Sequence, residues 1–146
     1  MRARSMVEEY PVTSLDSDAL AAARLLATHR LPGLVVTDGS GRPHSILGAS
    51  QVVRFIVPKY VQDDPSLAGV LDEQFADKVA NKLSGHSVRE LLPKETAELA
   101  VVDADDTVIE VAAIMARMRC PLVAVLDGDS VLGVITASRL LEKALG

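Results

Sequence analysis

Hydrophobic and polar residues follow a clear alternation of helical and strand patterns in the second half of the chain. Thr107 and Glu110 are spaced as in a capping box, which predicts that a helix begins here, and Pro121 predicts where it ends. The apolar run 122–126 predicts a strand, and the turn residues 127–130 join it to a second strand over 131–136. The helix itself is indicated by apolar residues at helical spacing, namely Val108, Val111, Ala112, Met115 and Met118.

The first half of the chain carries the same pattern, so the sequence contains an internal repeat. When Pro32 is aligned with Pro121, an offset of 89 residues, the two segments share Val12, Asp16, Ala23, Ala27, Arg30, Val36, Asp38 and Gly39. After one extra residue in the first turn, Ala49-Ser50 aligns with Ala137-Ser138. Two copies of one unit predict a pseudo-symmetric pair that buries a shared core.

Each copy therefore reads as strand, helix, strand, turn, strand and helix. Ser17 or Asp18 is the expected cap of the first helix. The remaining expected elements of the first copy are a strand over 34–37, a turn over 38–41, a strand over 45–47 and a helix over 50–57. In the second copy they are a strand over 99–102 and a helix over 138–145, and short helices over 87–92 and 2–7 precede the two copies.

A helical connector separates the copies, and we expect repeat 1 over 1–57, the connector over 58–86 and repeat 2 over 87–146. Asp64-Pro65 resembles a helix start and Gly85 a helix stop. The connector is either an amphipathic cover over the core or a docking face for a partner, anchored by Phe75 or Tyr60. Its apolar stripe consists of Leu67, Val70, Leu71, Phe75, Val79 and Leu83.

Composition narrows the functional classes. The 146 residues are 49% hydrophobic and 24% charged, as in one ordinary globular module. The net charge of −5 disfavours nonspecific binding to nucleic acid or anionic lipid. We find neither an apolar run of membrane-spanning length nor a signal-peptide pattern, and therefore expect a cytoplasmic protein without membrane insertion.

Catalytic and metal chemistry has little support in the sequence. Cys120 stands alone, so neither an intramolecular disulfide nor a cysteine-based metal site is expected. His29, His44 and His86 are not spaced as metal ligands and are not paired with a nucleophile. The acidic clusters precede helices, where carboxylates cap backbone N–H groups. We predict no catalytic residue and no metal site.

The repeated unit resembles the CBS domain, a module that usually occurs in tandem. The residues that carry the resemblance are 121–128 and 131–141 in the second copy, and 31–38 and 46–53 in the first. The resemblance implies an α/β (α+β) fold of two pseudo-symmetric β-α-β-β-α CBS units packed sheet to sheet. It also implies frequent pairing into homodimers and clefts that bind AMP, ADP, ATP or S-adenosylmethionine as regulatory ligands, with no cofactor required.

The ligand motif of the family has a glycine, two apolar residues, a serine or threonine, two variable residues and an aspartate. Gly133 and Thr136 match it, but Arg139 stands at the aspartate position. A hydroxyl at a helix start can join backbone N–H groups around a phosphate, and a guanidinium can pair with phosphate or remain a solvated helix residue. In the first copy Ser45, Gly48 and Gln51 stand at the glycine, hydroxyl and aspartate positions.

These matches give two candidate ligand sites. The preferred site, in the second copy, comprises Val101, Val102, Asp103, Arg119, Cys120, Pro121, Thr136, Ser138 and Arg139. The weaker site, in the first copy, comprises Val12, Thr13, Arg30, Leu31, Pro32, Ser50 and Gln51. Cys120 either borders the ligand or simply fills the core.

The resemblance thus implies a stand-alone regulatory CBS pair that senses an adenosine-type nucleotide. It would modulate a separate effector, such as a transporter, channel or enzyme, in trans. The missing aspartates favour an alternative, a dimerisation or interaction module that has lost nucleotide binding.

Overall fold

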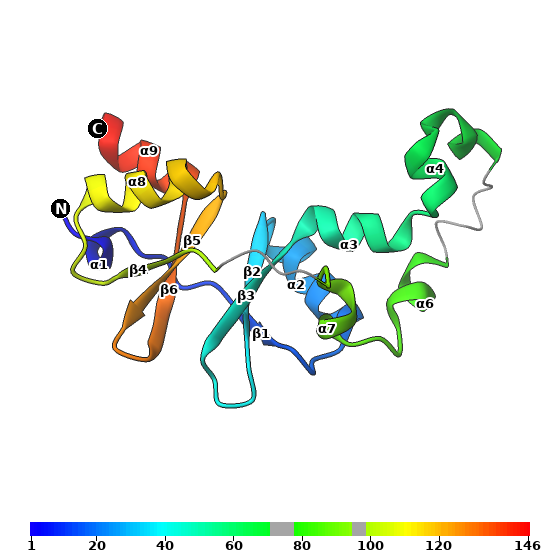
Figure 1. The fold of residues 1–146 in the computed structure, drawn as a ribbon, viewed down its shortest axis with the longest axis horizontal. Coiled ribbons are helices and arrows are strands. Elements are labelled where there is room, and N and C mark those ends of the chain that lie inside the picture. The colour runs from blue at the N-terminus through cyan, green and yellow to red at the C-terminus, as the bar shows by residue number, and fades with distance from the viewer. Residues whose placement is uncertain (71–77, 95–98) are drawn as a thin grey trace.

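The computed structural model describes residues 1–70, 78–94 and 99–146, which form two similar halves (Figure 1). The first half contains β1 (Val12–Ser14), α2 (Ala19–His29), β2 (Gly33–Thr37), β3 (Pro43–Gly48) and α3 (Ala49–Ile56). The second contains β4 (Val101–Asp103), α8 (Val108–Met118), β5 (Leu122–Asp127), β6 (Ser130–Thr136) and α9 (Ala137–Leu145). Short helices α1 (Ala3–Met6) and α7 (Val88–Leu91) precede them.

Each half has a three-stranded sheet with the same topology. In both, the first strand is parallel to the second and the second is antiparallel to the third. Val12 pairs with Val35 in the same way as Val101 pairs with Ala124, each shifted by 89 residues. Even the register irregularities repeat, between Val36 and Thr37 and between Val125 and Leu126. The predicted α/β fold of two pseudo-symmetric units is confirmed.

The two sheets pack against each other and form a small central core. Val35 from β2 meets Leu122 and Ala124 from β5, with Val134 of β6 beside them, and all four are almost fully buried. Two larger clusters lie on the outer faces, where α2 and α3 cover the first sheet and α8 and α9 cover the second. The molecule therefore has helices outside and facing sheets at its centre (Figure 1).

The short helix α1 precedes the first half in sequence but packs on the second half, and α7 precedes the second half but packs on the first. Backbone N–H groups of α1 donate to the second half, as in Ala3 N to Asp106 O at 2.8 Å. α7 is bonded to the first half, where Val88 N donates to Ser17 O at 2.9 Å. Met6 of α1 is accordingly buried in the core of the second half, and Val88 of α7 in the core of the first. Figure 1 shows α1 beside β4 and α8 of the second half. This crossover interleaves the two repeats.

The predicted helix starts are confirmed in both repeats. Asp18 caps α2 by accepting from Ala21 N at 3.1 Å, and Thr107 caps α8 by accepting from Glu110 N at 3.3 Å. The Glu110 carboxylate accepts from the Thr107 hydroxyl at 3.2 Å, and not from a backbone N–H as the capping box predicts.

The connector differs from the single helix that the sequence suggests. It contains α4 (Lys59–Asp63), a 3-10 helix η1 (Pro65–Val70) and α6 (Val79–Leu83). η1 begins at Pro65 as expected, but Leu67 N donates to Asp64 O, three residues back, which gives a tighter helix. Leu83 is buried in the core of the first half, which supports the covering role, whereas Tyr60 is 53% exposed and Phe75 lies outside the described residues.

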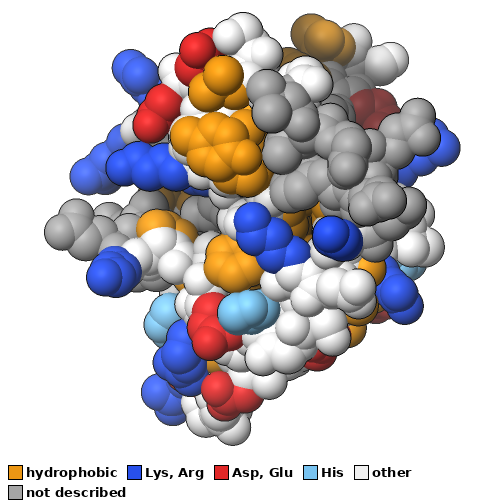
Figure 2. Space-filling view, turned by 90° about the vertical axis from the view of Figure 1, so that its right-hand side faces the viewer, with side chains coloured by type: hydrophobic (Ala, Val, Ile, Leu, Met, Phe, Trp, Pro, Cys, Tyr) orange, Lys and Arg blue, Asp and Glu red, His pale blue; other side chains and the backbone are white. Residues whose placement is uncertain are grey.

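Figure 2 shows the connector end of the molecule, where the described hydrophobic side chains alternate with charged ones. Within the described part of the chain, no helix has the length and apolar character needed to cross a bilayer.

Candidate functional site

A cavity of about 490 Å³ opens between the two repeats, and we call it the open cleft. Its volume lies within the usual range of small-molecule sites. One wall comes from the first repeat and consists of Pro32, Ser45, Ile46, Gly48, Ser50 and Gln51. The other wall consists of Leu92, Pro93, Leu99, Ala100, Met118, Arg119, Cys120 and Pro121.

The second wall is shaped by the way α8 ends. Arg119 adopts a left-handed conformation with φ of 51°, which turns the chain so that residues 119–121 face the cleft. Cys120 N closes this turn by donating to Met115 O at 3.3 Å, and Ala137 N donates to Pro121 O at 2.9 Å. The turn is thus tied both to its own helix and to the start of α9.

The first wall is shaped by the start of α3. Gly48 N donates to Gln51 Oε1 at 2.9 Å, so the Gln51 carbonyl caps the helix. This carbonyl stands where the family places a carboxylate, and its acceptor capacity is partly used by the backbone. Ser50 is exposed beside it at the mouth of the cleft.

The chemistry of the open cleft is apolar with one positive charge. Ile46, Leu99 and Met118 supply apolar surface, and Arg119 is the charged residue among those that line it. Burial raises the pKa of the Cys120 thiol, which therefore remains a neutral group at physiological pH. Such a cleft suits a planar apolar group that carries an anionic substituent.

The open cleft draws on both predicted sites rather than on one of them. Arg119, Cys120 and Pro121 come from the preferred site, and Pro32, Ser50 and Gln51 come from the weaker one. The two sets meet because the sheets face each other, which brings the end of α8 opposite β3 and α3.

Several predicted residues have structural positions away from the open cleft. Val102 and Leu31 are buried in the two outer cores, and Thr13 is buried with its carbonyl accepting from Thr37 Oγ1. Val101 is partly exposed on β4, and Asp103 Oδ1 accepts from Asp105 N in the following turn. Arg30 is exposed at the end of α2.

The remaining predicted residues, Thr136, Ser138 and Arg139, lie at the start of α9. Thr136 caps the helix by accepting from Arg139 N at 3.1 Å, and Ser138 is exposed. The Arg139 side chain turns toward the N-terminal segment, where Nε donates to Met6 O at 3.3 Å and lies 3.4 Å from Glu8 Oε1.

Eight residues that line the open cleft were not predicted as site residues from the sequence. They are Ser45, Ile46, Gly48, Leu92, Pro93, Leu99, Ala100 and Met118. The alignment of the two copies placed Ser45 and Gly48 in the ligand motif, which was a usable signal. Leu92, Pro93, Leu99 and Ala100 come from the segments around α7 and β4, and only the crossover brings them to this wall.

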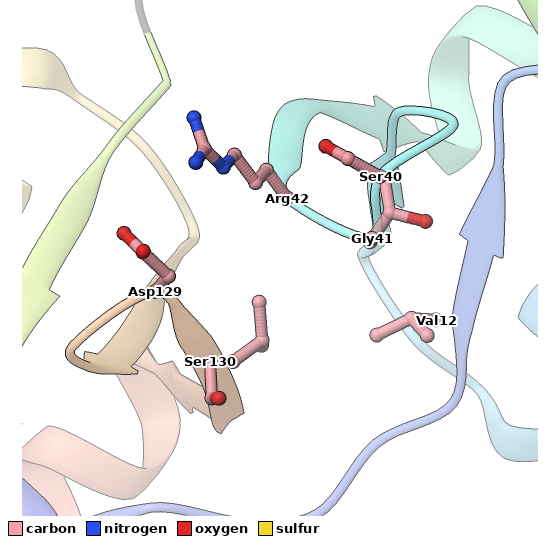
Figure 3. A pocket seen from close by; sticks show the side chains of 8 residues that line it. Val12, Ser40, Gly41, Arg42, Asp129 and Ser130 are labelled. Atoms are coloured by element: carbon pink, nitrogen blue, oxygen red, sulfur yellow. The ribbon is translucent and has the colours of Figure 1, made fainter.

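A second cavity of about 570 Å³ lies between the hairpin turns of the two sheets (Figure 3). Arg42 extends into the space from the β2–β3 turn, and Asp129 extends from the β5–β6 turn. Val12, another predicted site residue, lies at its edge. Arg42 and Asp129 are both exposed.

Over the described ranges, no group of three His, Cys, Asp or Glu residues is placed to hold a metal ion.

Comparison with known proteins identifies what this architecture is similar to. The family model of the CBS domain matches residues 88–146. A CBS domain-containing protein of unknown function from Kribbella flavida is 63% identical, with a TM-score of 0.91 over 100% of this chain and 99% of its own. No curated protein matches the sequence.

Two further solved structures share the fold at low sequence identity. CBSX2, in complex with AMP, is 16% identical with a TM-score of 0.69, over 99% of this chain and 96% of its own. The CBS domain pair of protein MJ0100, in complex with 5′-methylthioadenosine and S-adenosyl-L-methionine, is 18% identical with a TM-score of 0.66, over 100% of this chain and 97% of its own.

Proposed function

This chain belongs to the CBS-domain family, and we propose that its CBS pair senses an adenosine-type nucleotide in the open cleft. Ligand binding would regulate a separate effector, such as a transporter, channel or enzyme, in trans. One observation carries the proposal: the walls of the open cleft come from both repeats. A ligand held there contacts both, so it favours the packing of the pair that binds it more tightly.

The residues of the open cleft suit the parts of a nucleotide. Ile46 and Met118 supply apolar contacts for a base, and the Arg119 guanidinium supplies paired donors for phosphate oxygens. The complexes of AMP with CBSX2 and of S-adenosyl-L-methionine with protein MJ0100 support the same ligand class.

Thermal unfolding with AMP, ADP, ATP and S-adenosylmethionine tests this function. A ligand present at about 100 times its Kd adds about 2.7 kcal/mol to the unfolding free energy and raises Tm. Arg119→Gln should weaken ATP binding roughly tenfold, because it removes a charged donor. Arg30→Gln is the matched control, since Arg30 has the same backbone conformation but does not line the open cleft.

A second candidate function is a dimerisation module without a nucleotide. Two contacts favour it: Gln51 Oε1 is used by the backbone, and Arg139 is paired with Glu8. A folded protein whose Tm responds to none of the nucleotides would contradict the sensor and support this candidate.

Both candidates include a homodimer that forms through the last helices of the repeats. Val53 on α3 and Leu141 on α9 are equivalent positions, and each is 55% exposed. Arg54 and Glu142 follow them, both exposed and opposite in charge. When α3 of one chain faces α9 of a second chain, these opposite charges meet, which favours this head-to-tail pair.

A further inference from the structure

Residues 7–10, which we call the strap, run along the free edge of β6. Glu8 N donates to Val134 O and Val134 N donates to Glu8 O, both at 2.9 Å, so the strap pairs with the sheet as an additional short strand. Gly133 makes this approach feasible, because a Cβ at that position would fall on the Glu8 carbonyl oxygen.

The strap lies against positions of the second repeat that are equivalent to positions lining the open cleft in the first repeat. Ser45, Ile46 and Gln51 line the open cleft, and the residues equivalent to them in the second copy are Gly133, Val134 and Arg139. Each of these three contacts the strap or the residue before it. The positions that border a cavity in one half are therefore covered by the chain itself in the other.

The side chain of Glu8 completes the cover. Its carboxylate lies 3.4 Å from Arg139 Nε, and the two side chains are only 34% and 24% exposed. The Tyr10 hydroxyl donates a hydrogen bond to Glu8, which is the largest cause of the raised pKa of Tyr10. The carboxylate is thus held by one cationic and one neutral donor, as a bound oxyanion would be.

We propose that the Glu8 carboxylate occupies an oxyanion-binding position at Arg139 that would otherwise accept a phosphate group. Among the described residues, the position at Arg139 is then closed from within, which leaves the open cleft as the nucleotide site. The expectation of one bound nucleotide per chain rests on the proposed function. The contact between Glu8 and Arg139 does not depend on it, because that contact is seen in the structure itself.

Inorganic pyrophosphate is a suitable probe, because it presents phosphate oxygens without a nucleoside. Binding is followed through the Arg139 Nε–H signal and the Gly133 and Val134 amides by NMR in the wild-type chain, Glu8→Gln and Glu142→Gln. Glu142 is the matched control: it lies 3.5 Å from Arg139 Nη1, carries the same charge and is outside the strap.

Glu8→Gln should bind pyrophosphate at these signals roughly tenfold more tightly than the wild-type chain, because it removes a competing charge. Glu142→Gln should bind like the wild-type chain. Equal gains in both variants would reduce the effect to general electrostatics and overturn the proposal, as would no gain in Glu8→Gln.

Two additions keep the test decisive. If Glu8→Gln does not fold, Glu8→Asp replaces it, because the shorter side chain retains the charge but withdraws the carboxylate from Arg139. Glu8→Asp should also bind pyrophosphate more tightly than the wild-type chain. Unchanged affinity overturns the proposal. AMP binding in the open cleft is measured separately by thermal shift, so loss of the sensor function is distinguished from loss of the Arg139 site.

Discussion

Arg30 and Arg119 lie 89 residues apart and adopt the same left-handed backbone conformation, with φ of 52° and 51°. Each ends the first long helix of its repeat, and the following residue closes the turn on the helix: Leu31 N donates to Leu26 O, and Cys120 N to Met115 O. This conformation costs a residue with a side chain roughly 1–2 kcal/mol, and glycine is the usual occupant. In both repeats a strained arginine thus turns the chain, so that the proline two residues later, Pro32 or Pro121, lines the open cleft.

Glycine at either position should relieve this strain. Arg30→Gly and Arg119→Gly should each raise the free energy of unfolding by about 0.5–1 kcal/mol, the relief being reduced by the greater freedom of glycine in the unfolded chain. Urea unfolding measures both. Only Arg119→Gly should also weaken ATP binding, because only Arg119 lines the open cleft. Destabilisation by both variants would contradict the account of strain.

Gly133 should tolerate no side chain, because the strap lies against it. Gly133→Ala would place Cβ on the Glu8 carbonyl oxygen and within 2.9 Å of Val7 Cγ2, at φ of +156°. We expect a loss of about 2–3 kcal/mol in the free energy of unfolding. Gly39→Ala is the control, since no atom lies within 4 Å of the place that a Cβ would take there, and urea unfolding should show a change within about 0.5 kcal/mol.

Tyr10, the last residue of the strap, should make the stability of the folded chain depend on pH in the alkaline range. Its pKa is raised, first by the hydrogen bond to Glu8 and then by burial, so the folded state keeps this proton at a pH where the unfolded chain has lost it. The contribution of Tyr10 to the free energy of unfolding is therefore fully present below about pH 10, the pKa of tyrosine in the unfolded chain. It is lost as the pH rises through the higher pKa of Tyr10 in the folded chain. In a Tyr60→Phe background, ultraviolet titration should show that Glu8→Gln lowers the pKa of Tyr10. An unchanged pKa would contradict the hydrogen bond.

Local signals in the sequence predicted much of the fold. Caps such as Asp18 and Thr107, helix ends before Pro32 and Pro121, and apolar runs each act over a few residues, and all of them appear in the structure. The internal repeat added the pseudo-symmetry, because two similar units with exposed apolar faces are stable only when those faces meet.

The site was harder to predict, because it depends on contacts across the chain. The crossover of α1 and α7 leaves no periodic signal, yet it decides that residues near α7 line the open cleft. Nor does sequence spacing show that Arg139 is paired with Glu8, about 130 residues away. The connector is helical in its described residues, as predicted, but its apolar spacing fits one α-helix, whereas η1 is a 3-10 helix.

The proposed homodimer can be tested through Val53 and Leu141. Each is 55% exposed, and a carboxylate in a dimer core is costly, so Val53→Glu and Leu141→Glu should shift sedimentation equilibrium toward monomers. Tyr60→Glu is the control, because Tyr60 is similarly exposed but lies on the connector, and it should leave the equilibrium unchanged. Loss of the dimer only in Tyr60→Glu would move the interface to the connector.

The orientation of the pair follows from Arg54 and Glu142, which occupy equivalent positions with opposite charges. In a head-to-tail pair, Arg54 faces Glu142 of the second chain, so Arg54→Glu should weaken the dimer and adding Glu142→Arg should restore it. A head-to-head pair would instead place like charges together, because each Arg54 would face its own copy. Arg54→Glu alone would then leave two carboxylates facing each other, and adding Glu142→Arg would rescue nothing. Sedimentation equilibrium of the single and double variants therefore decides the orientation: rescue in the double variant requires the head-to-tail arrangement.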